Sequence, residues 1–386
     1  MVSYEVWESL ETKGKKEIKG RMLRLLSVDA RISMQDLANS LKTTKVNAYN
    51  AFNELSGEYG LRFVPEISID KLWKWEFIKR ARLRTKRGIL AEAVEELPLT
   101  GFGEYLVLVK FVGKKPADEE VVRAIGNSYA PQFAAKAKGE YDLVIYVVER
   151  SYEDAVRFSD VFSKNLSKYR MLAYTTRVWG NFGFFPISNK LIEQFDIFDT
   201  YKNLLFGLND GGRNTFTDIG KRFNQGPAQM LYAYDRLART EILKRVTYFE
   251  SKPRDNYLLM AIAKVDNDKA FEDSRNGWFV KLVKEYEDKE NEFVFMCDTP
   301  SPRGAVVISE LANKAAAGKF LSKMKKGLKG AEISGMQLTK VLLGGLGIRD
   351  FDMRYTSQYR RLERGRALPA AAEKGLETVE NPNALD

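Results

Sequence analysis

Apolar positions in the N-terminal part of the chain recur at the spacing of short helices. Residues 15–28 place an apolar side chain at every third or fourth position, which predicts one amphipathic helix. Ser33 has the position of an N-cap for a second helix over residues 34–41, and Thr43 or Thr44 has that position for a third helix. Two short helices joined by a tight turn, behind a supporting helix, predict a helix-turn-helix unit.

A different pattern follows between residues 103 and 193. Its β-branched and aromatic runs predict strands, and the capped amphipathic stretches between them predict helices. The expected order is a strand at 104–112, a helix at 118–129, strands at 132–136 and 141–148, a helix at 151–169 and a strand at 170–178. This βαββαβ order is that of a ferredoxin-like sheet with helices on one face. We therefore expect a second copy to cover the other face.

The second half of the chain repeats this order. The capping pair Thr215–Asp218 stands 182 residues after the pair Ser33–Asp36. Residues 257–343 again predict βαββαβ, including a helix at 271–286. We therefore expect an α+β protein in which winged-helix or helix-turn-helix DNA-binding domains and ferredoxin-like βαββαβ sandwich domains occur as two copies in tandem.

The expected domains follow from these patterns. They are a helix-turn-helix domain (1–65), a basic linker or insertion (66–102), a ferredoxin-like sandwich (103–193), a second, divergent helix-turn-helix (194–250), a second, divergent sandwich (251–350) and a C-terminal extension with a disordered tail (351–386).

The amino-acid composition excludes several kinds of catalytic and metal site. The chain has 62 Lys and Arg against 52 Asp and Glu, a net charge of +10, which suits a protein that binds a polyanion. It has no histidine and one cysteine, which excludes Ser-His-Asp and Cys-His catalysis, His-ligated metal sites and intramolecular disulfides. The first 20 residues lack the apolar region typical of a signal peptide, and no apolar run is long enough to span a bilayer. We therefore expect a cytoplasmic protein that is not an enzyme, makes no membrane contact and uses neither a cofactor nor a metal.

Two segments carry a family resemblance. LRLLSVDARISMQDLANSLKTTKVNAYNAFNEL and KGEYDLVIYVVERSYEDAVRFSDVF resemble the Lrp/AsnC (feast/famine) family of archaeal and bacterial transcription regulators. The resemblance covers residues 15–185 and, more weakly, 197–345. It implies a sequence-specific regulator that binds double-stranded DNA, self-associates through its sandwich domains and responds to a small-molecule effector such as an amino acid. With the internal duplication, one chain would form a pseudo-dimer that supplies both half-site readers.

Polar side chains at the start of the third helix are candidates for DNA contact, because asparagine can pair with adenine and lysine with phosphate. The second copy offers similar residue types at corresponding positions, and a basic run at 79–87 could lie along the phosphate backbone. The candidates are Thr43, Thr44, Lys45, Asn47, Asn50, Lys79, Arg80, Arg82, Arg84, Lys86, Arg87, Lys221, Arg222, Gln225 and Gln229. The structural alternatives are a solvated face of a three-helix bundle, a solvated basic loop and, in the second copy, a helix that only positions or dimerises the pair.

Gly139, Tyr141 and Asp142 are the effector candidates, and they rest on the family resemblance alone. The alternative is turn chemistry, in which glycine supplies an unusual backbone angle and aspartate caps a strand end. The matching stretch of the second copy, 304–307, lacks the Tyr-Asp pair. Two further functions stay open at this point. One is an architectural DNA-binding protein without sequence specificity, and the other is an enzyme that uses carboxylates or a metal on the ferredoxin-like sheet.

Overall fold

The computed structural model describes residues 15–69, 102–126, 128–182, 185–240, 242–250, 257–265, 292–300, 303–311, 313–327 and 331–345. The basic run at 79–87, the helix expected at 271–286 and the C-terminal extension lie outside these ranges.

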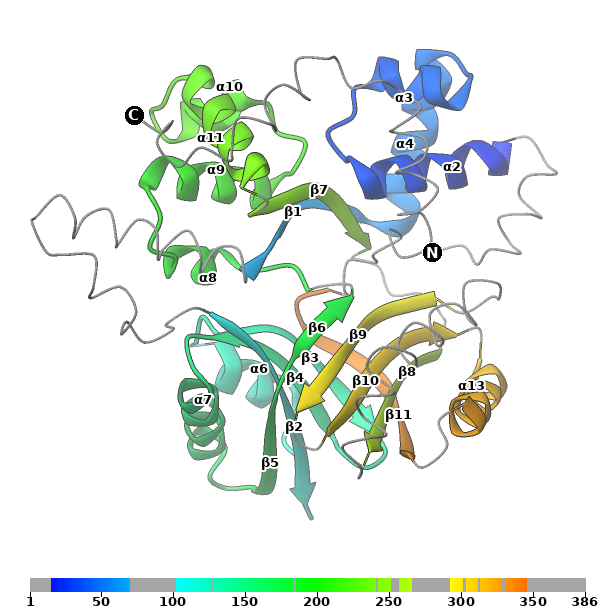
Figure 1. Ribbon diagram of the computed structural model, residues 1–386, viewed down its shortest axis with the longest axis vertical. Helices are drawn as coiled ribbons and strands as arrows, with labels where there is room; N and C mark the ends of the chain where they lie inside the picture. The colour runs from blue at the N-terminus through cyan, green and yellow to red at the C-terminus, as the bar shows by residue number, and fades with distance from the viewer. Residues whose placement is uncertain are drawn as a thin grey trace, which may run out of the picture. The chain divides into compact units, whose positions relative to one another are not determined.

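The first helical unit contains α2 (Lys15–Val28), α3 (Met34–Leu41) and α4 (Lys45–Tyr59) (Figure 1). The Ser33 hydroxyl accepts a hydrogen bond from the Asp36 N–H at 3.1 Å, so the predicted cap of α3 is confirmed. The Thr44 hydroxyl accepts one from the Asn47 N–H at 3.2 Å and caps α4 in the same way. The apolar sides of the three helices form one small core, which includes Met22, Leu23, Leu26, Leu37, Leu41 and Leu55.

The second helical unit has the same plan, with α9 (Asp199–Asp210), α10 (Phe216–Arg222) and α11 (Pro227–Arg239). The Thr215 hydroxyl accepts from the Asp218 N–H at 3.1 Å, which confirms the second predicted cap. Gly226 stands where the first unit has Thr44, and the Gln229 side chain accepts a hydrogen bond from the Gly226 N–H at 3.0 Å. Pro227 begins α11, a position where its missing N–H costs no helical hydrogen bond.

Each helical unit continues into a strand that the sequence pattern did not predict. β1 (Leu61–Ile67) and β7 (Leu243–Glu250) pair antiparallel as a two-stranded sheet, which we call the ribbon (Figure 1). Pro65 in the middle of β1 argues against the interior of a sheet, because proline has no N–H to donate. Both strands of the ribbon are edge strands, where proline is tolerated.

The remaining described strands form one nine-stranded sheet with the order β5-β2-β4-β3-β11-β8-β10-β9-β6. Its strands are β2 (Gly103–Val112), β3 (Pro131–Lys138), β4 (Leu143–Glu149), β5 (Arg170–Arg177), β6 (Trp179–Phe182), β8 (Tyr257–Val265), β9 (Glu292–Pro300), β10 (Arg303–Leu311) and β11 (Ala331–Leu343). The helices between them are α6 (Asp118–Gly126), α7 (Tyr152–Asn165), α8 (Asn189–Glu193) and α13 (Lys314–Gly327). The fold is therefore α+β with antiparallel strand pairing, as the sequence predicted.

The strand order shows two ferredoxin-like sets side by side. In β5-β2-β4-β3 the fourth, first, third and second strands of the first set are neighbours, and β11-β8-β10-β9 has the same order for the second set. β3 pairs with β11 and joins the sets into one sheet. β5 and β6 are the terminal strands of the sheet, yet only Val178 separates them along the chain. The sheet must therefore curve so that its two ends come close together.

The two faces of the sheet have different cores. On the helix-covered face of the first set, strand residues such as Ile145 pack with Phe158 and Phe162 of α7. The opposite face belongs to one large core that contains Tyr146 of the first set together with Val306 of the second. The open face is thus covered from within the chain. Within the described ranges, the structure contains no helix of the length and apolar character that a membrane crossing requires.

Candidate nucleic-acid interface

The exposed side of α4 carries the first group of predicted contact residues. Thr44, Lys45, Asn47 and Asn50 are exposed, and Thr43 is half-buried. They are exposed because Ala48 and Leu55 on the other side of the helix are buried in the core of the unit. Side chains that leave a rigid helix at its first two turns are positioned as a recognition helix requires.

Two apolar side chains stand among these polar ones. Val46 is 68% exposed and Tyr49 is 53% exposed, although large apolar side chains usually gain from burial. The sequence interpretation did not single them out, because a periodicity argument assigns apolar residues to the core. The signal that could have found them is that Ala48 and Leu55 already fill the inner positions of α4. An apolar side chain on a recognition helix can contact the methyl group of thymine.

The second unit also has exposed polar and apolar side chains at the start of its third helix, α11, but one of the predicted contact residues nearby already has an ion-pair partner. Gln229 is exposed, as are Leu231 at 47% and Tyr232 at 65%. Arg222 is exposed and forms an ion pair with Asp210. Lys221 is exposed as well.

Gln225 is the member of this group that the structure turns inward. It is half-buried, donates from its side chain to the Thr200 hydroxyl at 3.1 Å, and accepts a hydrogen bond from the Asn203 amide at 3.3 Å. These bonds tie the loop before α11 to α9. In the described structure Gln225 therefore has a structural role, while Gln229, Leu231 and Tyr232 form the outer edge.

The turns of the two units match in their backbone. Lys42 and Asn224, 182 residues apart, have φ of 54° and 53° and are the non-glycine residues with positive φ in the described part of the chain. Before each turn stands a small residue, Ala38 in one unit and Gly220 in the other. A Cβ at Gly220 would lie 2.4 Å from the carbonyl oxygen of Gln225, so the close approach of the chain requires glycine there.

Two arginines link the units in a reciprocal way. Arg31 donates to the carbonyls of Gly212 at 2.8 Å and Asn214 at 2.9 Å. Arg213, 182 residues later, donates to the carbonyls of Ala30 and Ile32, the latter at 3.1 Å. Each acceptor of one arginine stands 182 residues from an acceptor of the other. We call this pair of arginines the reciprocal clamp.

Aromatic rings complete the clamp. The Arg31 guanidinium lies over the Phe216 ring, 4.4 Å from its centroid, and near Tyr234 at 5.6 Å. The Arg213 guanidinium lies 5.1 Å from the centroid of Phe52, which is the residue 182 positions before Tyr234. Burial lowers the pKa of both guanidinium groups, and each is held by carbonyls of the other unit. The contacts bring the two helical units together as a pseudo-symmetric pair.

The ribbon adds a contact that breaks this symmetry. Glu66 of β1 is opposite Arg245 of β7, and its buried carboxylate lies 2.7 Å from the Arg245 Nε and 3.4 Å from the Lys244 Nζ. The offset of 182 residues relates Glu66 to Tyr248 and Arg245 to Phe63. These two aromatic residues are also opposite each other in the ribbon. One end of the ribbon is therefore ionic and the other aromatic, so each strand complements the other strand better than it complements a copy of itself.

The sequence also predicts that the basic run at 79–87 contacts phosphates. Its residues, Lys79, Arg80, Arg82, Arg84, Lys86 and Arg87, lie outside the described residues. Their role in phosphate contact stays a prediction from the sequence.

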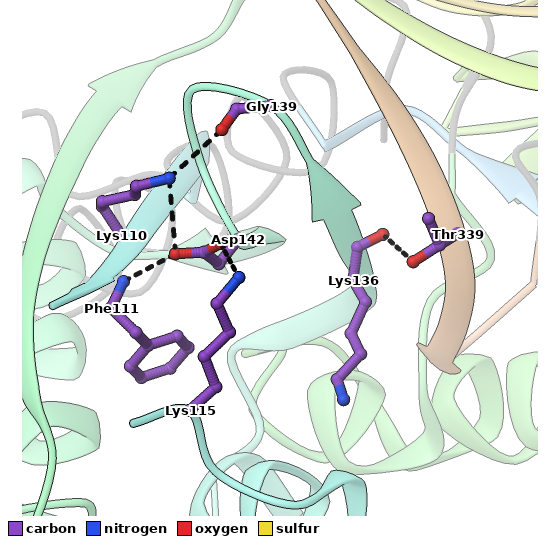
Figure 2. Close-up of polar contacts among 7 residues, drawn as sticks. All are labelled: Lys110, Phe111, Lys115, Lys136, Gly139, Asp142 and Thr339. Atoms are coloured by element: carbon purple, nitrogen blue, oxygen red, sulfur yellow. Dashed lines mark hydrogen bonds and ion pairs between the residues drawn. The ribbon is translucent and has the colours of Figure 1, made fainter. Parts of the chain in front are cut away.

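The predicted effector residues lie where β3 ends and β4 begins. Figure 2 shows two of them, Gly139 and Asp142. The Asp142 carboxylate is 5% exposed and accepts from the Lys115 Nζ at 2.6 Å and from the Phe111 N–H at 2.9 Å. Lys110 lies 3.7 Å from the same carboxylate and donates to the Gly139 carbonyl at 3.1 Å. Burial alone would raise the pKa of Asp142, but these donors outweigh it and hold the pKa below its usual value.

The same turn contacts the second strand set. A Cβ at Gly139 would lie 2.7 Å from the Cβ of Met336 on β11, so the absence of a side chain lets β11 approach. Glu140 accepts from Ser334 at 3.0 Å and pairs with Lys264 at 3.3 Å. Burial, followed by the charge of Glu140, raises the pKa of Tyr141 to about 12, so its hydroxyl stays protonated. The turn thus joins the two sets, and its role in effector binding stays a prediction.

Other chemistry on the described sheet is limited. Within the described ranges, no group of three or more Cys, Asp and Glu side chains is arranged to hold a metal ion. A surface pocket between α6 and α7 is lined partly by Glu120 and Lys168, which pair with each other. The hydrogen bond from Lys168, followed by those from the Tyr169 hydroxyl and the Ala117 N–H, lowers the pKa of Glu120 to about 2. Its carboxylate is therefore an ionised partner in a bonded cluster.

The described structure combines two helix-turn-helix units, which the ribbon joins, with a ferredoxin-like antiparallel sheet. This combination is what the comparisons with known proteins can test. No protein-family model and no curated protein matches the chain. Among solved structures, the siroheme decarboxylase NirDL matches with a TM-score of 0.53 and 11% identity, over 91% of this chain and 100% of that chain. NirDL in complex with an iron-uroporphyrin III analogue matches with a TM-score of 0.52 and 10% identity over the same shares. A transcriptional regulatory protein of the AsnC family from Pyrococcus furiosus matches over 37% of this chain and 90% of that chain, with 14% identity and a TM-score of 0.31.

These comparisons correct one expectation. The sequence led us to expect that the protein is not an enzyme, and that expectation is contradicted, because two solved structures that match 91% of the chain are those of an enzyme. The expectation rested on the lack of histidine and cysteine chemistry and on the helix-turn-helix units, and neither excludes an enzyme on this fold. A fold fixes the arrangement of a chain and not its chemistry.

Proposed function

We propose that the chain is a sequence-specific, double-stranded DNA-binding regulator in which a tandem duplication supplies both recognition helices, α4 and α11. The observation that carries the proposal is the reciprocal clamp. Its matched contacts pair the two helix-turn-helix units and so fix the distance between them. A fixed distance is what a protein needs in order to bind two half-sites on one DNA duplex at the same time.

The exposed residues indicate what each helix would contact. Lys45 and Asn47 at the start of α4 are exposed. The Asn47 amide donates a long hydrogen bond, 3.5 Å, to the Thr43 hydroxyl of the preceding turn. Lysine suits phosphate or guanine, and asparagine suits adenine. On α11 the corresponding edge offers Gln229, Leu231 and Tyr232, which is a different set of donors and apolar groups. The operator is therefore expected to consist of two unlike half-sites.

The experiment is selection of duplex DNA from a random library at near-physiological salt. We expect the purified chain to enrich a motif with two parts, and Asn47→Ala or Lys45→Ala to weaken binding to it by about 1 to 3 kcal/mol where a base contact is lost. Asn53→Ala is the matched control, because Asn53 is exposed on the same helix but two turns away from its start. Binding without enrichment would indicate an architectural protein, and equal effects of Asn47→Ala and Asn53→Ala would remove α4 as a recognition helix.

A second candidate function follows from the match to a siroheme decarboxylase over nearly the whole chain. Under this hypothesis the chain binds an anionic tetrapyrrole and removes carboxyl groups from it. The chain has no histidine, so any proton transfer would fall to other side chains such as tyrosine or lysine. Incubation with siroheme followed by mass spectrometry tests it, because loss of carbon dioxide from the tetrapyrrole would establish the activity and unchanged mass would refute it.

A further inference from the structure

The solvent side of α13 differs in charge from every other described helix of the sheet. Five lysines on this helix are exposed, and its sequence KAAAGKFLSKMKKG contains no acidic residue. They are Lys314, Lys319, Lys323, Lys325 and Lys326. The residues between them on the outer side are small, so no bulky group covers the lysines. We call this surface the lysine face.

The packing of α13 explains why all the lysines point outward. Ala317, Phe320 and Met324 are buried and face β8, β10 and β11. At about 100° per residue, the five lysines fall within the half of the helix opposite these three side chains. None of the five forms an ion pair with a carboxylate of the described residues, so the charge of the lysine face is not neutralised there.

The equivalent helix of the first strand set shows that this charge is not required by the fold. α7 covers β2, β4 and β5 as α13 covers the second set. Its sequence YEDAVRFSDVFSKN has three acidic and two basic residues, and Arg157 pairs with Asp154 at 3.0 Å. The same position in the architecture thus carries a net charge of −1 in one set and +5 in the other. A feature present in only one of two equivalent helices needs a cause other than packing.

We propose that the lysine face is a second nucleic-acid contact, which binds the phosphate backbone of duplex DNA without sequence preference. Lysine supplies a flexible point charge and no planar fork, which suits phosphates rather than base edges. A helix of 14 residues is about 21 Å long, and B-DNA presents one phosphate charge per about 1.7 Å of its axis, so five lysines meet more phosphates than they can neutralise. The overall charge of +10 favours the same partner. The inference extends the proposed DNA-binding function, but it concerns surfaces that α4 and α11 do not use.

The test is the salt dependence of binding to a duplex without an operator. Each phosphate contact contributes about −0.9 to the slope of log K against log salt. The variant Lys319→Gln, Lys323→Gln, Lys326→Gln removes three charges and keeps good helix-forming residues. We expect it to make the slope less steep by about 2.7 and to leave the thermal melting temperature unchanged.

A matched control separates the lysine face from total charge. Lys114, Lys138 and Lys164 are exposed residues of the first strand set, and their replacement by glutamine lowers the net charge by the same three units. We expect this control to change the slope by less than about one. Equal changes in both triple variants would overturn the proposal, and so would no change in either.

Two further arms identify the partner and keep the proposals apart. Binding of both triple variants to vesicles of phosphatidylcholine and phosphatidylserine tests a membrane surface, and a loss confined to vesicles would overturn the proposal. Lys45→Ala with Asn47→Ala is measured on the same duplex. If the operator-free slope depends on α13 and selection finds no motif, the lysine face stands without the regulator. If selection finds a two-part motif and the operator-free slope does not depend on α13, the regulator stands without the lysine face.

Discussion

The reciprocal clamp gives the sharpest test of how the two helical units are held together. Replacing Arg31 by methionine keeps an unbranched apolar chain but removes two charge-assisted hydrogen bonds, at 2.8 and 2.9 Å, and the contact with the Phe216 ring. Hydrogen bonds to charged groups contribute about 1.5 to 3 kcal/mol each, and a cation–π contact about 0.5 to 1 kcal/mol. Partial exposure of the guanidinium reduces this sum. We expect Arg31→Met to lower the free energy of unfolding by about 2 to 4 kcal/mol.

The pseudo-symmetry sharpens the expectation. Arg213→Met removes the related contacts and should cost a similar amount, whereas the double variant should cost less than the sum, because either loss weakens one shared interface. Urea unfolding at neutral pH measures all three free energies. Arg157→Met is the control, since Arg157 is exposed and makes an ion pair within α7, so a cost below about 0.5 kcal/mol is expected. Costs for Arg31→Met and Arg213→Met that equal the control would refute the clamp.

Three further predictions concern the ribbon, the turn before β4 and the helix-turn-helix turn. Glu66→Arg and Arg245→Glu should each lower the free energy of unfolding by about 3 kcal/mol or more, and the combined exchange should recover most of this loss. If the two losses simply add in the double variant, the buried ion pair does not hold the ribbon. Asp142→Asn should cost about 2 to 3 kcal/mol at pH 7. Because the folded-state pKa of Asp142 is lowered, its contribution is present above about pH 4 and is lost as the pH falls further, so unfolding curves of the two proteins should converge in acid; a difference that persists there would contradict this. Lys42→Gly should raise the thermal midpoint by removing an unfavourable positive φ, with a gain of about 0.5 to 1 kcal/mol, and a fall in the midpoint would show that the turn is not strained.

The helical units could be predicted because their causes are local. Ser33 and Thr215 cap the helices that follow them, and each cap needs a residue only three positions away. The apolar spacing of α3, α4, α10 and α11 is equally short-range. The ribbon could not be predicted in this way. β1 contains Pro65, and its reason to be a strand is β7, which lies about half the chain away in sequence.

The candidate site also contains features with local causes, which the sequence predicts, and features with long-range causes, which it does not. The exposure of Lys45, Asn47 and Asn50 follows from the helix pattern, whereas the inward turn of Gln225 depends on Thr200 and Asn203 of another helix. The reciprocal clamp leaves no local sequence pattern, since its donors and acceptors are about 180 residues apart. The expected absence of enzymatic activity failed for another reason. It was an inference from composition and a motif to a chemistry, and a shared fold with a decarboxylase shows that neither of them decides the chemistry.

The central claim is that one chain holds two unlike recognition helices at a fixed separation. The measurement that tests it most directly is binding to the selected operator when base pairs are inserted between its two parts. An insertion of about 5 base pairs turns one half-site to the opposite side of the duplex, and about 10 base pairs restore its side. We predict that the first insertion lowers affinity by about tenfold or more, that the second recovers part of the loss, and that Arg31→Met with Arg213→Met removes this dependence on spacing. Affinity that does not depend on spacing in the unmodified chain would contradict the account.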